Sequence, residues 1–184
     1  RLTANRTIES FYKWSGGGRI PIFCDTTSCT HTLLFENGGD ILTPENREKY
    51  KQLKIMDITQ WLKEVVLPRI KVIRPKNRIL LHPTCSCQIM GLTPVLLDIA
   101  RKCAREVILP DNWGCCGASG DRGFIFPELS DSATRDERDE IGHESFDGCY
   151  SLARTCEIAM QDHIEQPYES IVYLVDETIQ DQGT

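Results

Sequence analysis

Cysteine is the residue type through which this sequence points to chemistry. The 184 residues include nine cysteines, two of which are adjacent in the turn Gly114-Cys115-Cys116-Gly117. A disulfide between neighbouring residues strains the peptide that joins them, whereas two thiolates that splay from one turn can bind a metal ion or a cluster. The flanking glycines allow positive φ angles and a close approach of the backbone. We therefore interpret this turn as part of a metal or cluster site.

One turn supplies two ligands, so the others must come from elsewhere in the chain. Cys85 directly follows a predicted strand, and Cys156 lies near the start of a predicted helix. Soft thiolate ligands favour iron–sulfur clusters or zinc over hard cations. We predict that Cys85, Cys115, Cys116 and Cys156 are the metal ligands. Cys29 is predicted as a further cofactor ligand, either at this site or at a preceding one.

The remaining cysteines fit a packing role better than a disulfide framework. The total number of cysteines, nine, is odd and the spacings are long or adjacent, unlike those of small secreted scaffolds, which indicates a reduced, cytosolic protein. Four of them are expected to pack in the interior: Cys24, Cys87, Cys103 and Cys149. His31 and His82 lie beside cysteine turns, and we expect them to be hydrogen-bonded structural residues.

Hydrophobic periodicity predicts helices that alternate with strands. Strands are expected at 20–23, 78–82, 107–109 and 171–175, and helices at 1–14, at 93–103 with Thr93 as N-cap, in the acidic region after 127, and at 150–164. This order predicts an α/β fold with a mostly parallel sheet and flanking helices. The main cysteine clusters fall just after predicted strands, where open α/β sheets place their sites.

Composition and charge exclude several classes of function. The net charge of −6, with an isoelectric point near 5.3, argues against a nucleic-acid partner. No apolar run approaches the roughly 20 residues of a transmembrane helix. Residues 127–147 carry a net charge of −6 and residues 45–78 one of +6. Such segments are either solvated faces or surfaces that dock on a partner domain.

The cysteine pattern resembles a known family. Cys85 after His82-Pro83, the Cys115-Cys116 turn and Cys156 are similar to the cysteine-rich CCG domain. This domain occurs in heterodisulfide reductase and in the iron–sulfur subunits of glycolate oxidase and anaerobic glycerol-3-phosphate dehydrogenase. The segment from Asp25 to Cys29 resembles the end of a first repeat. The resemblance implies that residues 1–36 end a preceding, truncated repeat and that residues 37–184 form a Rossmann-like CCG domain.

The sequence departs from the family at one position. The family pattern ends in Cys-x-x-Cys, whereas Ala159 stands where the last cysteine is expected. A five-cysteine, non-cubane cluster therefore lacks one ligand here. The four thiolates still satisfy an ordinary [4Fe–4S] cluster or a Cys₄ zinc site.

Three further segments narrow the resemblance: 121–124, 154–157 and 170–174. They are similar to the carboxyl-terminal part of bacterial FAD-linked dehydrogenases of D-lactate or D-2-hydroxyglutarate. The resemblance implies a [4Fe–4S]-type cluster that passes electrons from flavin to an external acceptor, such as a quinone, a cytochrome or an electron carrier. FAD-binding and ferredoxin-like regions would belong to the full-length enzyme, and this chain alone is not expected to be catalytically complete. The expected location is the cytoplasm, either free or peripheral at the inner face of the membrane.

Three alternatives stay open at the level of sequence. The Cys₄ site can hold a structural zinc ion, which would make the chain an assembly module. The pair Cys115 and Cys116 can cycle between dithiol and disulfide. The chain can also be a metal-free interaction domain whose acidic segment docks on a flavin domain.

Overall fold

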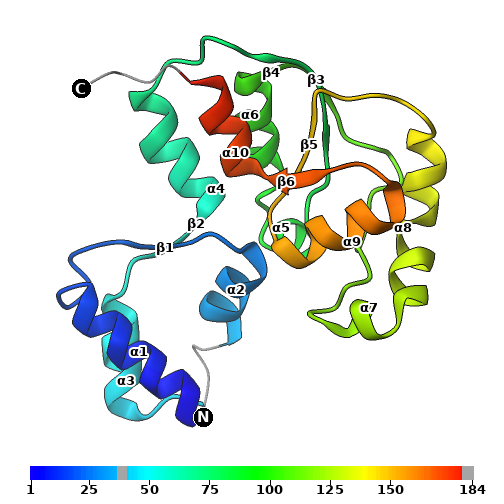
Figure 1. The fold of residues 1–184 in the computed structure, drawn as a ribbon. Coiled ribbons are helices and arrows are strands. Elements are labelled where there is room, and N and C mark those ends of the chain that lie inside the picture. The colour runs from blue at the N-terminus through cyan, green and yellow to red at the C-terminus, as the bar shows by residue number, and fades with distance from the viewer. Residues whose placement is uncertain (37–40, 180–184) are drawn as a thin grey trace.

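Helices and parallel strands alternate along the chain in the computed structural model, which describes residues 1–36 and 41–179 (Figure 1). The strands are β1 (Ile22–Cys24), β2 (Ile55–Asp57), β3 (Lys76–Leu81), β4 (Ala104–Ile108), β5 (Gly148–Ser151) and β6 (Tyr168–Ser170). The α-helices are α1 (Leu2–Trp14), α2 (Thr27–His31), α3 (Pro44–Gln52), α4 (Ile58–Trp61), α5 (Cys85–Ile89), α6 (Thr93–Cys103), α7 (Arg122–Ile125), α8 (Pro127–Ile141), α9 (Arg154–Ile164) and α10 (Ile171–Thr178). Two π-helical turns (Thr32–Glu36 and Leu62–Val66) and a 3₁₀ turn (Leu67–Arg69) extend α2 and α4.

The main sheet has four parallel strands in the order β4-β3-β5-β6. The central strand β3 is paired on both sides, so that Leu80 lies opposite Ile108 on β4 and Cys149 on β5. The predicted α/β class, with a parallel sheet and flanking helices, is confirmed.

Helices cover both faces of this sheet because successive strand residues point to opposite sides. Ile79 and Leu81 pack with buried residues of α4, α6 and α10, whereas Leu80 packs with those of α8 and α9. Figure 1 shows α6 and α10 on one side of β3 and β5, with α8 and α9 on the other. Each face of β3 therefore supports a separate apolar cluster.

The strand order creates a topological switch point beside β3. From β3 the chain crosses through α5 and α6 to β4 on one side, and then returns through α7 and α8 to β5 on the other. Connections that leave in opposite directions open a crevice at the carboxyl ends of the strands, where α/β proteins bind their ligands. The segments after β3, β4 and β5 meet at this crevice.

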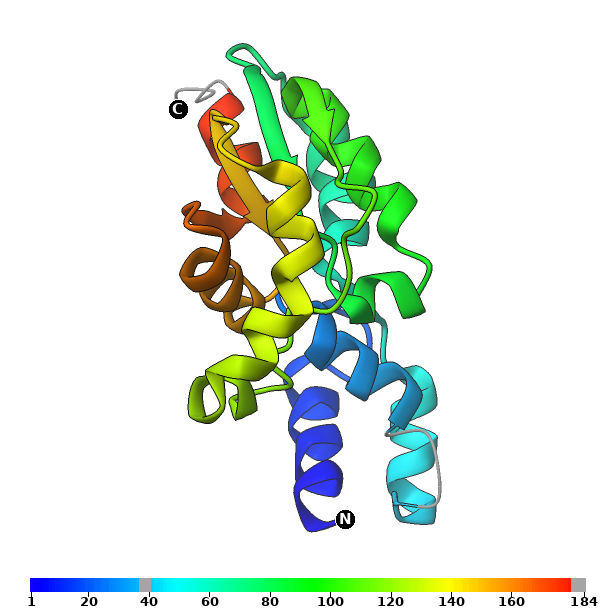
Figure 2. The same cartoon turned by 90° about the vertical axis from the view of Figure 1, so that its right-hand side faces the viewer.

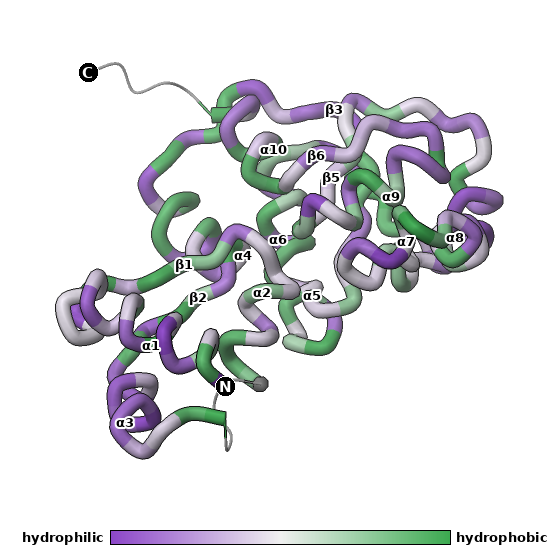
Figure 3. The backbone as a smooth tube through the Cα atoms, turned by 60° about the horizontal axis from the view of Figure 1, so that its bottom comes forward, coloured by the Kyte–Doolittle hydropathy of each residue, from purple (hydrophilic) through white to green (hydrophobic). Residues whose placement is uncertain are grey.

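The amino-terminal part forms a smaller parallel pair of β1 with β2, next to the packed helices α1 and α3. In Figure 3, α3 is largely hydrophilic, whereas β1 and β2 carry hydrophobic residues. Gly18, at φ +84°, allows the chain after α1 to pass close to α3, since a Cβ at this position would lie 2.0 Å from the carbonyl oxygen of Gln52.

The pair β1–β2 repeats the arrangement of the pair β5–β6. A cysteine follows each first strand by five residues, Cys29 after β1 and Cys156 after β5. Each second strand ends in the N-cap of the next helix, Asp57 for α4 and Ser170 for α10. The proposed domain boundary between residues 36 and 37 separates β1 from its partner β2 and adjoins residues 37–40, which lie outside the described residues. That division stays a prediction.

Three local predictions were wrong. The expected strand at 171–175 is helix α10, in which Ile171, Leu174 and Val175 are buried at helical spacing and the strand ends before it, at Ser170. Helix α6 is capped by Leu92 and begins at Thr93, so Thr93 is not its N-cap. Strand β5 occupies the start of the helix expected at 150–164, which begins at Arg154.

The position of β3 leads to a stability prediction. Ile79 is fully buried between α-helices and neighbouring strands, so Ile79→Ala should lower the free energy of unfolding by about 2–5 kcal/mol through lost contacts and a residual cavity. Ile20→Ala, at a side chain that is 60% exposed, should change it by less than about 0.5 kcal/mol. Urea denaturation measures both, and equal losses would contradict the assignment of β3 as the centre of the core.

Candidate metal centre

Four of the five predicted ligands converge at the switch point. Cys85 is the first residue of α5 and directly follows the end of β3, and Cys156 is the third residue of α9, after β5. Cys115 and Cys116 lie in the segment that connects β4 to α7. Three separate segments of the chain therefore bring their thiols to one locus at the carboxyl ends of β3, β4 and β5.

The thiols form a continuous chain of contacts. The Sγ atoms of Cys116 and Cys156 lie 2.9 Å apart, which is too far for a disulfide bond, and all nine cysteines are free thiols. Cys115 interacts with Cys116 on one side and with Cys85 on the other. Cys85 and Cys115 are exposed, whereas Cys116 and Cys156 are buried. One half of the site thus faces solvent and the other half faces the core.

Crowding disfavours ionisation of these thiols. Burial and the charge of Cys115 raise the pKa of Cys85. The hydrogen bond with Cys116, together with burial, raises the pKa of Cys115. Cys115 lowers the pKa of Cys116, but Cys156 and burial outweigh this effect and raise it to about 12. Several thiolates in this space repel one another unless a cation lies among them.

Backbone N–H groups point at three of the sulfur atoms. The amide of Gly117 donates to Cys115 Sγ at 3.4 Å. Backbone amides of Ala118 and Ser86 likewise favour the thiolates of Cys116 and Cys85. Hydrogen bonds of this kind stabilise a coordinated thiolate and tune the potential of a cluster. The donor set, four thiols with amides directed at their sulfurs, fits a thiolate-ligated metal group.

The thiols of Cys116 and Cys156 lie closer together than two ligands of one metal ion would. In residues 1–36 and 41–179, no three His, Cys, Asp or Glu side chains stand in the arrangement of a formed metal site. A tetrahedral zinc ion with Zn–S bonds of about 2.3 Å separates its sulfurs by about 3.8 Å. The pair Cys116–Cys156, at 2.9 Å, would therefore open by about 0.9 Å on binding zinc. A cubane cluster needs a wider separation still.

Two glycines allow the Cys115-Cys116 turn to pack closely against the start of α8. Gly117 has a φ angle of +73°, and a Cβ there would lie 2.6 Å from the carbonyl oxygen of Leu129. Gly123 approaches from α7 and donates its N–H to the carbonyl oxygen of Ala118 at 2.8 Å. The positions of the two thiols thus depend on backbone packing that only glycine permits.

The buried residue His82 anchors the turn that carries Cys85. Its Nδ1 lies 3.0 Å from Oε2 of Glu137 on α8, and its carbonyl oxygen accepts a hydrogen bond from Ser151 Oγ at 2.8 Å. The prediction of a hydrogen-bonded structural histidine is confirmed. Sequence reasoning missed Glu137, which stands in an acidic run that resembles a solvated face. Its spacing from buried Thr134 and Ile141 places it on the inner side of α8 and is the signal that identifies it.

The other cysteines do not join the four-thiol cluster. Cys29 is exposed. Partial burial of its thiol raises its pKa, and the neighbouring Cys24 and Asp25 raise it further. Helix α2, which carries Cys29, packs against α5, but the thiol itself interacts with Cys24 and Ser28. The prediction that Cys29 is a further cofactor ligand therefore stays a prediction. Cys87, Cys103 and Cys149 are buried in the core as expected, and Cys24 is half-buried.

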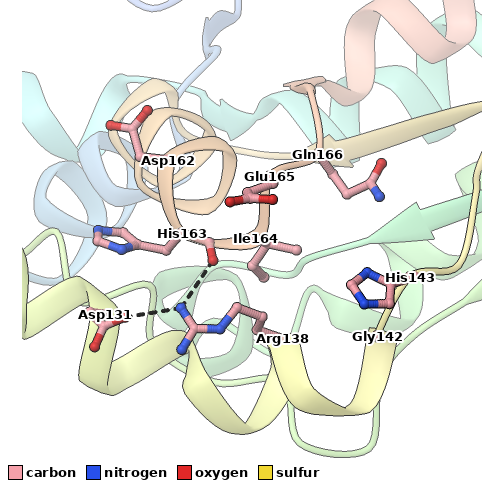
Figure 4. A pocket seen from close by; sticks show the side chains of 9 residues that line it. All are labelled: Asp131, Arg138, Gly142, His143, Asp162, His163, Ile164, Glu165 and Gln166. Atoms are coloured by element: carbon pink, nitrogen blue, oxygen red, sulfur yellow. Dashed lines mark hydrogen bonds and ion pairs between the residues drawn. The ribbon is translucent and has the colours of Figure 1, made fainter.

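A cavity of about 570 Å³ lies elsewhere, between the carboxyl ends of α8 and α9 (Figure 4). Its lining contains no cysteine. Arg138 lies between the Asp131 carboxylate, at 2.9 Å, and the carbonyl oxygen of His163, at 3.2 Å. In Figure 4 the rings of His143 and His163 lie at opposite ends of the cavity. This cavity does not compete with the cysteine site.

Comparisons with known proteins identified no match: neither a protein-family model nor a curated protein matches this chain. In the part of the chain that the structure describes, every helix is too short or too polar to cross a membrane.

The glycine contacts generate a matched pair of variants. Gly123→Ala would place its Cβ 2.6 Å from Ser130 Oγ and 2.8 Å from Ala118 Cα, so the turn must shift, at a cost of about 1–3 kcal/mol in unfolding free energy. Gly114→Ala meets nothing within 4 Å and should be nearly neutral. Urea denaturation measures the difference, and similar stabilities would show that the turn does not need the close contact with α8.

Burial of Cys149 predicts a loss of stability at high pH. Burial raises the pKa of this thiol from 9.0 to about 12, so the unfolded chain loses the proton first as pH rises above 9. The unfolding free energy of the metal-free protein should therefore fall between pH 9 and 12, with about 1–2 kcal/mol from this residue at pH 10.5. Urea titrations at pH 8 and 10.5 should show a smaller loss for Cys149→Ala than for the wild type. An equal loss would assign the effect to other groups.

Proposed function

We propose that Cys85, Cys115, Cys116 and Cys156 bind an iron–sulfur cluster of the [4Fe–4S] type and that the chain is an electron-transfer domain. The observation that carries this proposal is the convergence of four thiols from three segments at the switch point of a parallel sheet. Cysteines with only a packing role have no reason to gather where α/β folds bind ligands.

The electrostatics of the site support a bound cation. Contacts with neighbouring thiols and burial raise the pKa values of Cys85, Cys115 and Cys116. Coordination removes this penalty because the thiolates then face metal ions instead of one another. A bound cluster would supply one-electron redox chemistry. The amides near Cys85, Cys115 and Cys116 would hold the thiolates, and burial of Cys116 and Cys156 would limit access of water.

The wider role extends this proposal to a full-length enzyme. The resemblance of 121–124, 154–157 and 170–174 to FAD-linked dehydrogenases supports a role after flavin chemistry. Flavin in another region would oxidise a D-2-hydroxy acid, such as D-lactate or D-2-hydroxyglutarate, by taking a hydride. This chain would then pass the two electrons singly to a quinone, a cytochrome or an electron carrier. We propose a cytoplasmic location, free or peripheral at the inner face of the membrane.

A structural zinc site is the second candidate, and the short distance between two of the thiols favours it. The sulfurs of Cys116 and Cys156 are closer to the spacing required by one zinc ion than to that of a larger cluster. The thiol–disulfide alternative has less support. Raised pKa values suppress the thiolate that attacks a disulfide, and the thiol of Cys116 also contacts that of Cys156, at 2.9 Å.

Metal analysis after strictly anaerobic purification tests the proposal. We expect near-stoichiometric iron and sulfide and an electron paramagnetic resonance signal in one of the two redox states. Cys115→Ser, which removes an exposed ligand, should lose most of the iron. Cys29→Ser removes another exposed thiol, one outside the four-thiol cluster, and separates the two ligand predictions: retained iron assigns the cluster to the four thiols alone, and partial loss of iron makes Cys29 a further ligand.

Zinc at one equivalent with no iron, even after anaerobic cluster reconstitution, would favour the structural zinc site. Loss of iron in Cys29→Ser but not in Cys115→Ser would contradict the ligand assignment. Circular dichroism of both variants separates loss of metal from loss of fold.

A further inference from the structure

Four large apolar side chains are exposed together at the junction of α7 and α8. Phe124, Ile125, Phe126 and Leu129 are 46%, 66%, 46% and 41% exposed, and we call them the apolar corner. Figures 1 and 2 show α7 and the first turn of α8 projecting from the body of the molecule. Exposed apolar residues that occur singly need no explanation, but a contiguous group indicates an interaction surface.

The corner has a defined shape. The amides of Phe124, Phe126 and Leu129 donate to the carbonyl oxygens of Asp121, Arg122 and Phe126 at 3.1, 2.9 and 3.0 Å. On the inner side, Ser130 and Thr134 of α8 are buried. The backbone is thus held by its own hydrogen bonds, and the apolar side chains stay on the outside.

The corner is built directly on the Cys115-Cys116 turn. Gly123 precedes it and bonds to Ala118, and the carbonyl of Leu129 lies against Gly117. Cys115 belongs to the exposed half of the site. A partner that covered the corner would therefore lie beside the thiols through which the site is open to solvent.

The charge next to the corner restricts the partner. Helix α8 carries the exposed acids Glu128, Asp136 and Asp139, and its two arginines, Arg135 and Arg138, both lie within ion-pair distance of Asp131. Before the corner, the exposed residues Asp121 and Arg122 together add no net charge. An acidic rim selects a basic partner and repels the anionic surface of a membrane. Interfaces of this kind have an apolar centre and a polar rim.

We infer that the apolar corner and the acidic face of α8 form the docking surface for a redox protein domain whose contact face is apolar at its centre and basic at its rim. This inference rests on the proposed function. One electron leaves the reduced donor and enters the oxidised acceptor across the interface. No covalent bond forms or breaks, and no proton is transferred. The reduction potentials of the cluster and of the partner's redox group set the direction of electron transfer.

Electron transfer to a defined probe tests the inference. The protein, reconstituted anaerobically and reduced with dithionite, is mixed in a stopped-flow instrument with ferricytochrome c, a basic haem protein, at low ionic strength. Ile125→Ser and Phe126→Ser should each lower the second-order rate constant about tenfold, as expected for central interface residues. Glu128→Lys should lower it and weaken its salt dependence. Ile73→Ser, at an exposed isoleucine before the amino end of β3, is the matched control and should stay within about twofold.

Ferricyanide, a small oxidant that needs no docking, should oxidise the three serine variants at the wild-type rate; Glu128→Lys is left out of this control, because ferricyanide is a trianion and a charge reversal changes its rate by itself. Unchanged cytochrome rates in the corner variants would overturn the inference while leaving the proposed function intact. Concentration-dependent dimerisation that Ile125→Ser abolishes would assign the corner to a second copy and would also overturn it.

A protein that takes up no iron during reconstitution would contradict the proposed function, and this outcome is distinct from the failure of docking. Binding of cytochrome c to the metal-free chain, followed by microscale thermophoresis, then tests the surface alone. Weaker binding by Ile125→Ser than by Ile73→Ser would support the docking surface, and equal binding would overturn it.

Discussion

The central strand β3 is held by parallel hydrogen bonding between β4 and β5, and the place where these three strands end determines the position of every thiol in the candidate site. Cys85 follows β3, Cys156 follows β5, and the Cys115-Cys116 turn lies in the return connection from β4. Because the chain leaves β3 in one direction and returns on its other side, these segments meet at one crevice. A change in strand order would keep each local turn and still scatter the ligands.

The site combines attraction and repulsion in a way that favours a metal group. Backbone amides donate to the sulfurs of Cys85, Cys115 and Cys116, whereas burial and the neighbouring thiols together raise the pKa of each of these cysteines. The first effect prepares thiolates and the second prevents several of them from forming together without a cation. A site intended for fast thiol exchange would instead lower the pKa of its attacking cysteine.

The amino-terminal pair β1–β2 repeats the arrangement of β5–β6, in which a cysteine follows the first strand of a parallel pair and the second strand ends in a helix N-cap. Its cysteine, Cys29, occupies the position that Cys156 holds after β5, and Asp57 caps α4 as Ser170 caps α10. The difference lies in the neighbouring strand: β5 pairs with β3 as well as with β6, whereas β1 pairs with β2 alone among the described residues. Accordingly, the thiol of Cys29 interacts with that of Cys24, whereas the larger sheet assembles the other four.

The sequence by itself determined the α/β class and the buried strand before Cys85, because these depend on local periodicity. It also predicted Cys85, Cys115, Cys116 and Cys156 as ligands of one site, because adjacent thiols between glycines are a local signal, one of the other two follows a predicted strand and the other lies near the start of a predicted helix. The short strands β5 and β6 were not predicted, because three or four residues carry too little periodicity. The apolar run at 171–175 fits a buried strand as well as helix α10. Only the tertiary structure decided which thiols meet, that Glu137 is buried against His82, and that the apolar corner borders the cysteine turn. The first two facts are contacts between segments distant in sequence, which the order of strands in the sheet sets and no local pattern encodes. The third is a contact within the connection from β4 to β5, where Leu129 packs against Gly117.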